Sequence, residues 1–243
     1  MGAERVTYLV LYIFLAILII LVDVLLNKLW LTHSCYRYKT EIANLIRVGF
    51  TIVMSLVFNL PLGFSGINSG WQTWLPFFLG IGLFAISYFS LQIAYKEGVT
   101  HEYIPLNNLL DGSLGEKVLL LGLFVPLGEE LFYRGLIQNL FVKAIGALGA
   151  ILLTILVFVG IHYGNVISGF ETKEQFFSML LGRLLLTSVL GWLYLESQSI
   201  WLPIFIHALQ DLGTYLIVYG KEKKLGSSKP PNLLGEKDSR TDI

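Results

Sequence analysis

Apolar residues run along this chain in long blocks, separated by short polar segments. A block of about 20 apolar residues is long enough to cross a bilayer as an α-helix. The blocks that we recognise are 6–31, 42–62, 72–95, 117–142, 147–163, 176–195 and 200–219. The pattern predicts an all-α polytopic membrane protein, a bundle of about seven transmembrane helices, or eight if the long first block divides.

The composition agrees with a membrane protein. Of the 243 residues, 55% are hydrophobic and 14% are charged, whereas soluble domains carry about 25% charged residues. The formal net charge is zero, so no basic surface for nucleic acid is expected. Cys35 is the single cysteine, which excludes a disulfide framework and any multi-cysteine metal site. We expect one integral membrane domain over residues 1–220.

The two ends of the chain differ in character. The apolar part of the first block is about 20 residues, longer than a signal-peptide core, so we expect it to stay as a membrane anchor. Residues 221–243 are polar, with Pro-Pro and Gly, and are predicted to form a disordered tail. Lys and Arg gather in this tail and in the alternate loops on its side. The apolar blocks predict a multi-pass protein of the cell membrane. The positive-inside rule predicts that its N-terminus is outside and its C-terminal tail is cytoplasmic.

The segment PLGEELFYRG, residues 126–135, places two carboxylates and an arginine inside the fourth apolar block. Each charged side chain at the centre of a bilayer costs about 2.5–3.5 kcal/mol on insertion scales. Glu130 and Arg134 are one helical turn apart and are predicted to form an ion pair. Glu129 is rotated by about 100° from Glu130, so it is left free for chemistry.

A structural alternative needs no chemistry. Pro126 and Gly128 would break the helix, and the two glutamates would occupy the first turn of its second half. Acidic residues there complement the helix dipole for about 0.3–1 kcal/mol. This gain is smaller than the insertion cost, so the functional interpretation is favoured.

Two later blocks carry histidine. The segment FVGIH places Phe158 and His162 one turn apart, and HALQD does the same for His207 and Asp211. If these helices converge on Glu129, every ionisable group finds a partner and the insertion costs offset one another. A cluster of ionisable groups inside a membrane is a candidate functional site.

Other polar residues in the blocks are interpreted without chemistry. Asp23, Arg47 and Arg183 lie near the ends of their blocks. We expect them to reach lipid headgroups or to pair locally.

The residue types of the cluster suit hydrolysis. A carboxylate beside a histidine can hold and deprotonate a water molecule, and a polar pair opposite can stabilise an oxyanion. No Ser-His-Asp or Cys-His nucleophile is evident in the sequence, so we predict attack by an activated water. Two histidines with carboxylates can also bind a divalent metal such as zinc. Glu129, His162 and His207 are then the candidate ligands, and the spacing does not separate the two versions.

EELFYRG, FVGIH and HALQD resemble, in the same order, the three motifs of the CAAX-protease and bacteriocin-processing (CPBP/Abi) family of intramembrane proteases, which includes type II CAAX prenyl endopeptidases. The family pattern is a Glu-Glu pair with an arginine four residues after the second, a Phe four before a His, and a last His four before Asn or Asp. The first motif is specific, whereas the other two are weak alone. The resemblance covers roughly the C-terminal half of the chain.

The resemblance implies roles for individual residues. Glu129 would be the catalytic glutamate, and His162 would help it position the attacking water. His207 and Asp211 would occupy the oxyanion-stabilising positions. The residues implied to support the site are Glu130, Arg134 and Phe158. The family has been described both as zinc-dependent and as glutamate-dependent, so the metal is left unassigned.

Asp211 departs from the prenyl-protease branch, which has asparagine there. An ionised aspartate repels an oxyanion, so Asp211 would have to be protonated or accept a hydrogen bond from His207. A carboxylate at this position also makes metal binding easier.

Three functions stay open at this point. The first is an intramembrane endopeptidase, surrounded by membrane lipid, that acts on peptide or membrane-protein substrates and binds no nucleic acid. The second is a non-catalytic bacteriocin immunity or membrane interaction protein of the same fold. The third is a small ion or proton carrier that uses Glu129 and His162, although no inverted repeat is visible in the sequence.

Overall fold

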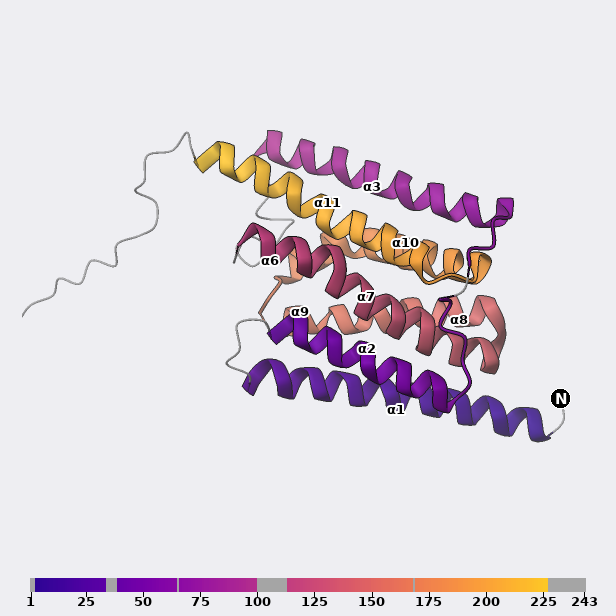
Figure 1. Ribbon diagram of the computed structural model, residues 1–243. Helices are drawn as coiled ribbons and strands as arrows, with labels where there is room; N and C mark the ends of the chain where they lie inside the picture. The colour runs from indigo at the N-terminus through magenta and orange to yellow at the C-terminus, as the bar shows by residue number, and fades with distance from the viewer. Residues whose placement is uncertain (1–2, 34–38, 65, 100–112, 168, 227–243) are drawn as a thin grey trace, which may run out of the picture.

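The computed structural model describes residues 3–33, 39–64, 66–99, 113–167 and 169–226. In these ranges the regular secondary structure is helical throughout, which confirms the predicted all-α class. The helices lie alongside one another as a bundle (Figure 1). Large apolar side chains such as Leu56, Phe89 and Leu156 are exposed on its outer faces, as expected for surfaces that contact lipid.

The N-terminal half forms three long helices: α1 (Ala3–His33), α2 (Lys39–Val57) and α3 (Trp71–Glu97). The C-terminal half begins with a run of helical segments that follow one another directly: α6 (Leu114–Leu119), η1 (Leu120–Phe124), α7 (Val125–Glu130), η2 (Leu131–Gln138) and α8 (Asn139–His162). The short α9 (Gly164–Ile167) and the long α10 (Lys173–Ser197) and α11 (Trp201–Gly226) complete the described chain. In Figure 1, α1 and α3 lie at opposite edges of the bundle, and the run from α6 to α8 lies between them.

The helices account for all seven predicted apolar blocks. Five helices are long and apolar enough to cross a membrane, and Leu9–Leu25 forms a shorter apolar helix. The longest of the five, Leu114–Ile167, contains Gly146 with φ 80° and ψ 175°, a conformation that is not helical. The chain turns back there (Figure 1), so this segment contains two of the predicted blocks. No eighth apolar helix occurs within the described ranges.

The first motif lies at the centre of the bundle. All eight residues of η2 are buried, because α2, α8 and α10 pack around it. Leu131, Phe132 and Leu136 are each at most 1% exposed. A helix surrounded by protein on every side can hold charged groups away from lipid.

Pro126 and Gly128 do not break this helix, so the structural alternative for the two glutamates is wrong. The backbone stays helical from α6 to α8, with π-helical geometry in η1 and η2. Pro126 lies at the start of α7, directly after η1, where the changed hydrogen-bond pattern accommodates its missing N–H. Glu129 and Glu130 are therefore inside a continuous helix, and their placement cannot be explained by a free helix N-terminus.

Basic residues near the helix ends lie at the same end of the bundle, as the predicted orientation requires. Figure 1 shows the end of α3, the starts of α6 and α10 and the end of α11 at the same end of the bundle. Lys96, Lys117 and Lys173 thus lie at the same end as the last turns of α11. Which side of the membrane this end faces stays a prediction. Helix α11 continues to Gly226, beyond the predicted domain end at 220, whereas Cys35 and residues 227–243 lie outside the described residues.

Candidate active site

A buried ion pair forms the centre of the polar cluster. Arg134 Nε lies 3.0 Å from Glu130 Oε2, and both side chains are 0% exposed, which confirms the predicted pairing. Arg134 Nη2 also donates to the carbonyl oxygen of Thr187 on α10 at 3.5 Å. Its guanidinium lies over the ring of Phe158, 5.3 Å from the centroid. A buried arginine with a counter-ion, a carbonyl and an aromatic face fixes α8 and α10 around η2.

His207 brings α11 into the same cluster. Its Nδ1 lies 2.7 Å from Glu130 Oε1, while its Nε2 lies 3.3 Å from Asp211 Oδ2 and 3.9 Å from Glu129 Oε2. Glu130 therefore binds Arg134 with one oxygen and His207 with the other. Because an ionised carboxylate only accepts, Nδ1 is the donor, and the Nε2 side of the ring faces Glu129 and Asp211.

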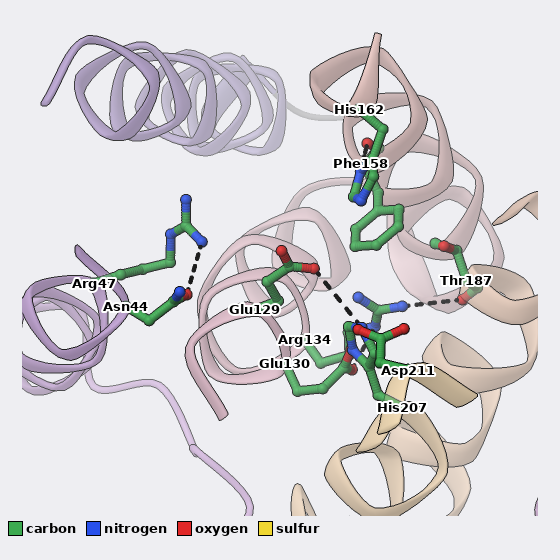
Figure 2. A network of polar contacts seen from close by, with 10 residues as sticks. All are labelled: Asn44, Arg47, Glu129, Glu130, Arg134, Phe158, His162, Thr187, His207 and Asp211. Carbon is green, nitrogen blue, oxygen red and sulfur yellow. Dashed lines mark hydrogen bonds and ion pairs between the residues drawn. The ribbon is translucent and has the colours of Figure 1, made fainter. Parts of the chain in front are cut away.

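His162 is held by its own helix. Its Nδ1 lies 2.9 Å from the carbonyl oxygen of Phe158, and the two rings pack at 4.3 Å between centroids. A carbonyl can only accept, so Nδ1 is the donor and Nε2 keeps its lone pair in the neutral ring. Figure 2 shows the carboxylate of Glu129 facing the region between His162 and His207.

Of the three predicted helices, the fourth block (α7 and η2) and the seventh block (α11) meet through direct contacts between side chains. Helix α8 joins the cluster through Phe158, which contacts both Arg134 and His162.

Exposure divides the cluster into two parts. Glu130 and Arg134 are completely buried, and His207 is 5% exposed. Glu129 and Asp211, in contrast, are 18% and 30% exposed. Water can reach the second part but not the first, so the two adjacent glutamates have different environments.

The cluster contains residue types that bind divalent metals, but they are not arranged as a metal site. Among the described residues, no group of three or more His, Cys, Asp or Glu side chains is arranged to hold one. Nδ1 of His207 is engaged by Glu130, and Nε2 faces Asp211 and Glu129 at hydrogen-bond or longer distances. The side chains as placed therefore do not fit a metal site, and metal dependence stays a hypothesis from the sequence.

The remaining polar residues of the spans pair locally, as predicted. Arg47 on α2 pairs with Asp23 on α1, with Nε 2.9 Å from Oδ1. Arg183 on α10 pairs with Glu171, which also accepts from Asn165. The sequence did not single out Glu171, because it lies in a polar loop.

The fold and the cluster together define a multi-pass helical membrane protein with ionisable side chains enclosed by its spans. Residues 115–213 match the sequence model of the Rce1-like family, the type II CAAX prenyl endopeptidase Rce1-like proteins. The matched range contains all three motifs and confirms the resemblance to the CPBP/Abi family. This is a family of proteases, so a peptidase is supported at the level of the family. No curated protein and no solved structure matches the chain.

Proposed function

We propose that the protein is an intramembrane endopeptidase that hydrolyses peptide bonds with a water molecule activated by Glu129 and His162. The division of the cluster by exposure is the observation that carries this proposal. Glu130 is buried and occupied by two partners, whereas Glu129 is accessible and faces the gap between two histidines. A carboxylate with this accessibility, whose contact with His207 is as long as 3.9 Å, is suited to act as a general base.

The proposed reaction uses only side chains of this chain. The Nε2 lone pair of His162 accepts a hydrogen bond from the water, and Glu129 removes its proton. The resulting hydroxide attacks the carbonyl carbon of the substrate, and the carbonyl oxygen becomes an oxyanion. When the C–N bond breaks, Glu129 returns the proton to the leaving nitrogen, so the base is restored.

His207 is proposed to stabilise the oxyanion. Its Nδ1 is fixed by Glu130, so Nε2 is the ring nitrogen that can face a substrate carbonyl. In the substrate-free arrangement Asp211 Oδ2 lies 3.3 Å from Nε2. Asp211 therefore serves as the acceptor that holds a protonated Nε2 in place, and this role accommodates an aspartate where the prenyl-protease branch has asparagine.

The test is Glu129→Gln, which keeps the shape of the side chain and removes the base. Membrane peptides from cells with the wild type and with this variant are compared by mass spectrometry. Loss of general base catalysis lowers product formation by about 10²–10⁴-fold. Glu97→Gln, at the exposed end of α3, is the matched control and leaves the peptides unchanged. Product formation that survives Glu129→Gln at equal abundance rules out the hydrolytic assignment.

A non-catalytic membrane immunity or interaction protein is the second candidate. It is favoured by the complete burial of Glu130 and Arg134, whose network joins η2, α10 and α11 without any need for chemistry. Under this alternative, variants of the cluster act only through the abundance of the folded protein. Equal abundance of Glu129→Gln and wild type, with peptides that differ, decides between the two.

A further inference from the structure

A second polar group faces Glu129 from the side opposite His207. Arg47 on α2 binds Asp23 on α1 with two nitrogens, Nε to Oδ1 at 2.9 Å and Nη2 to Oδ2 at 3.0 Å. Its third nitrogen, Nη1, donates to Asn44 Oδ1 at 3.3 Å. The side chains of Arg47 and Asp23 are 12% and 6% exposed. Figure 2 shows Asn44 and Arg47 on one side of Glu129, with His207 and Asp211 on the other.

The close approach of α2 to α7 brings this group to the site. A Cβ added to Gly128 would lie 2.5 Å from Asn44 Oδ1, so a side chain at this position would displace the side chain of Asn44. Arg47 lies over the ring of Phe132, 5.6 Å from its centroid. Its guanidinium interacts electrostatically with Glu129 as well as with Asp23. Arg47 thus interacts with an aspartate on α1 and with the partly exposed glutamate of α7.

The cationic groups on the His207 side of Glu129 are already paired with other carboxylates. His207 is shared with two more carboxylates, Glu130 and Asp211, and Arg134 is paired with Glu130. Like charges at short distance repel one another more strongly in a medium of low dielectric than in water. Arg47 lies on the other side of Glu129, away from His207 and Asp211 (Figure 2), and its positive charge acts on Glu129 from there.

Given the hydrolytic function proposed for Glu129, we propose that Arg47 is a positioning residue for this carboxylate. The positive charge of Arg47 attracts the Glu129 carboxylate and keeps it on the α2 side of the site, apart from Glu130 and Asp211, so that its place relative to the attacking water is fixed. This role goes beyond local pairing, because it depends on which member of the pair carries the positive charge.

Three variants separate positioning from simple stabilisation. Arg47→Lys keeps the positive charge next to Glu129. The double variant D23N/R47Q keeps the capacity for hydrogen bonds and removes both charges. The double variant D23R/R47D keeps the ion pair and reverses its direction. The probe is a synthetic peptide that spans a cleavage site found only in cells with active Glu129, presented to the full chain in proteoliposomes.

The expected order of rates per folded molecule follows the charge near Glu129. Arg47→Lys stays within about threefold of wild type, D23N/R47Q falls about tenfold or more in kcat, and D23R/R47D falls further. The KM of all three stays within about twofold, because Arg47 acts through Glu129 and not on the substrate. E171Q/R183Q is the matched control, a pair that also includes an arginine over an aromatic ring, and keeps the wild-type rate per folded molecule.

The proposal is overturned if D23N/R47Q matches Arg47→Lys in kcat, or if D23R/R47D restores the wild-type rate. If the reversed pair does not accumulate, the comparison of the other two variants decides alone. These results are distinguishable from failure of the proposed function. If the proposed function is wrong, Glu129→Gln keeps its activity. If only the role of Arg47 is wrong, Glu129→Gln is inactive and the Arg47 variants remain active.

Discussion

Glu129 and Glu130 are neighbours in the chain, yet their side chains have opposite surroundings. The rotation of about 100° per helical residue directs Glu130 into the protein and Glu129 toward a partly open space. Each oxygen of Glu130 has a cationic or N–H partner, Arg134 on one side and His207 on the other. Removing one member of such a buried network leaves the other charged and unpaired, which typically costs about 3–5 kcal/mol.

The role of Asp211 as the acceptor for His207 can be tested by single substitutions. In the proposed role it accepts from His207 Nε2, and an asparagine oxygen can do the same. Asp211→Asn is expected to retain the rate of peptide hydrolysis within about threefold. Asp211→Leu leaves Nε2 without an acceptor, and we expect a loss of about 10²-fold in kcat, as for removal of an oxyanion-hole group. Equal rates for both variants at equal abundance would contradict this role for Asp211.

The arrangement of the helices brings motifs that are distant in the sequence to one place. Two π-helical segments, η1 and η2, lie on either side of α7, which carries Glu129 and Glu130. Departures of this kind from α-helical geometry often occur at functional sites. At Gly146 the chain reverses, so α8 returns along η2 and presents Phe158 to Arg134. The turn therefore determines whether His162 reaches the cluster.

Gly146 is expected to be intolerant of a side chain. Its φ of 80° with ψ of 175° belongs to a region that glycine alone adopts readily. Gly146→Ala should lower the free energy of unfolding by about 1–3 kcal/mol, measured by thermal denaturation in detergent. Gly82→Ala, within α3 with no atom within 4 Å of the added Cβ, is the control and should not lower stability. A Gly146→Ala melting temperature equal to that of the control would disprove this requirement.

At the scale of the whole molecule, basic residues are separated between the two ends of the bundle. Lys96, Lys117 and Lys173 lie at the end where α11 finishes. At the other end, Lys143 donates to the carbonyl oxygens of Phe58 and Asn59. The orientation predicted by the positive-inside rule places the end of α11 in the cytoplasm.

The single native cysteine makes this orientation easy to measure. In a Cys35→Ser background, Ile67→Cys and Lys223→Cys place a thiol at opposite ends of the bundle. A membrane-impermeant maleimide added to intact cells is expected to label the Ile67→Cys protein and to leave the Lys223→Cys protein unlabelled until the membrane is opened. The reverse pattern of labelling would show the opposite orientation.

Much of the fold follows from the sequence, because the bilayer restricts the choices. A backbone in hydrocarbon must satisfy its own hydrogen bonds, so apolar blocks of about 20 residues become helices. All seven blocks are helices, and the Glu130–Arg134 pair was predictable from a spacing of one turn. The segments η1 and η2 were not predictable, since π-helical geometry has no simple sequence period.

The sequence by itself determined the class of the protein, the three motifs and the contacts within one helix, since these depend on composition and on spacing along the chain. The tertiary structure alone decided the partners across helices. Glu130 binds a histidine 77 positions later, and Arg47 binds an aspartate 24 positions earlier. Such contacts depend on how helices cross and how closely their backbones approach, and no local pattern in the chain records either quantity.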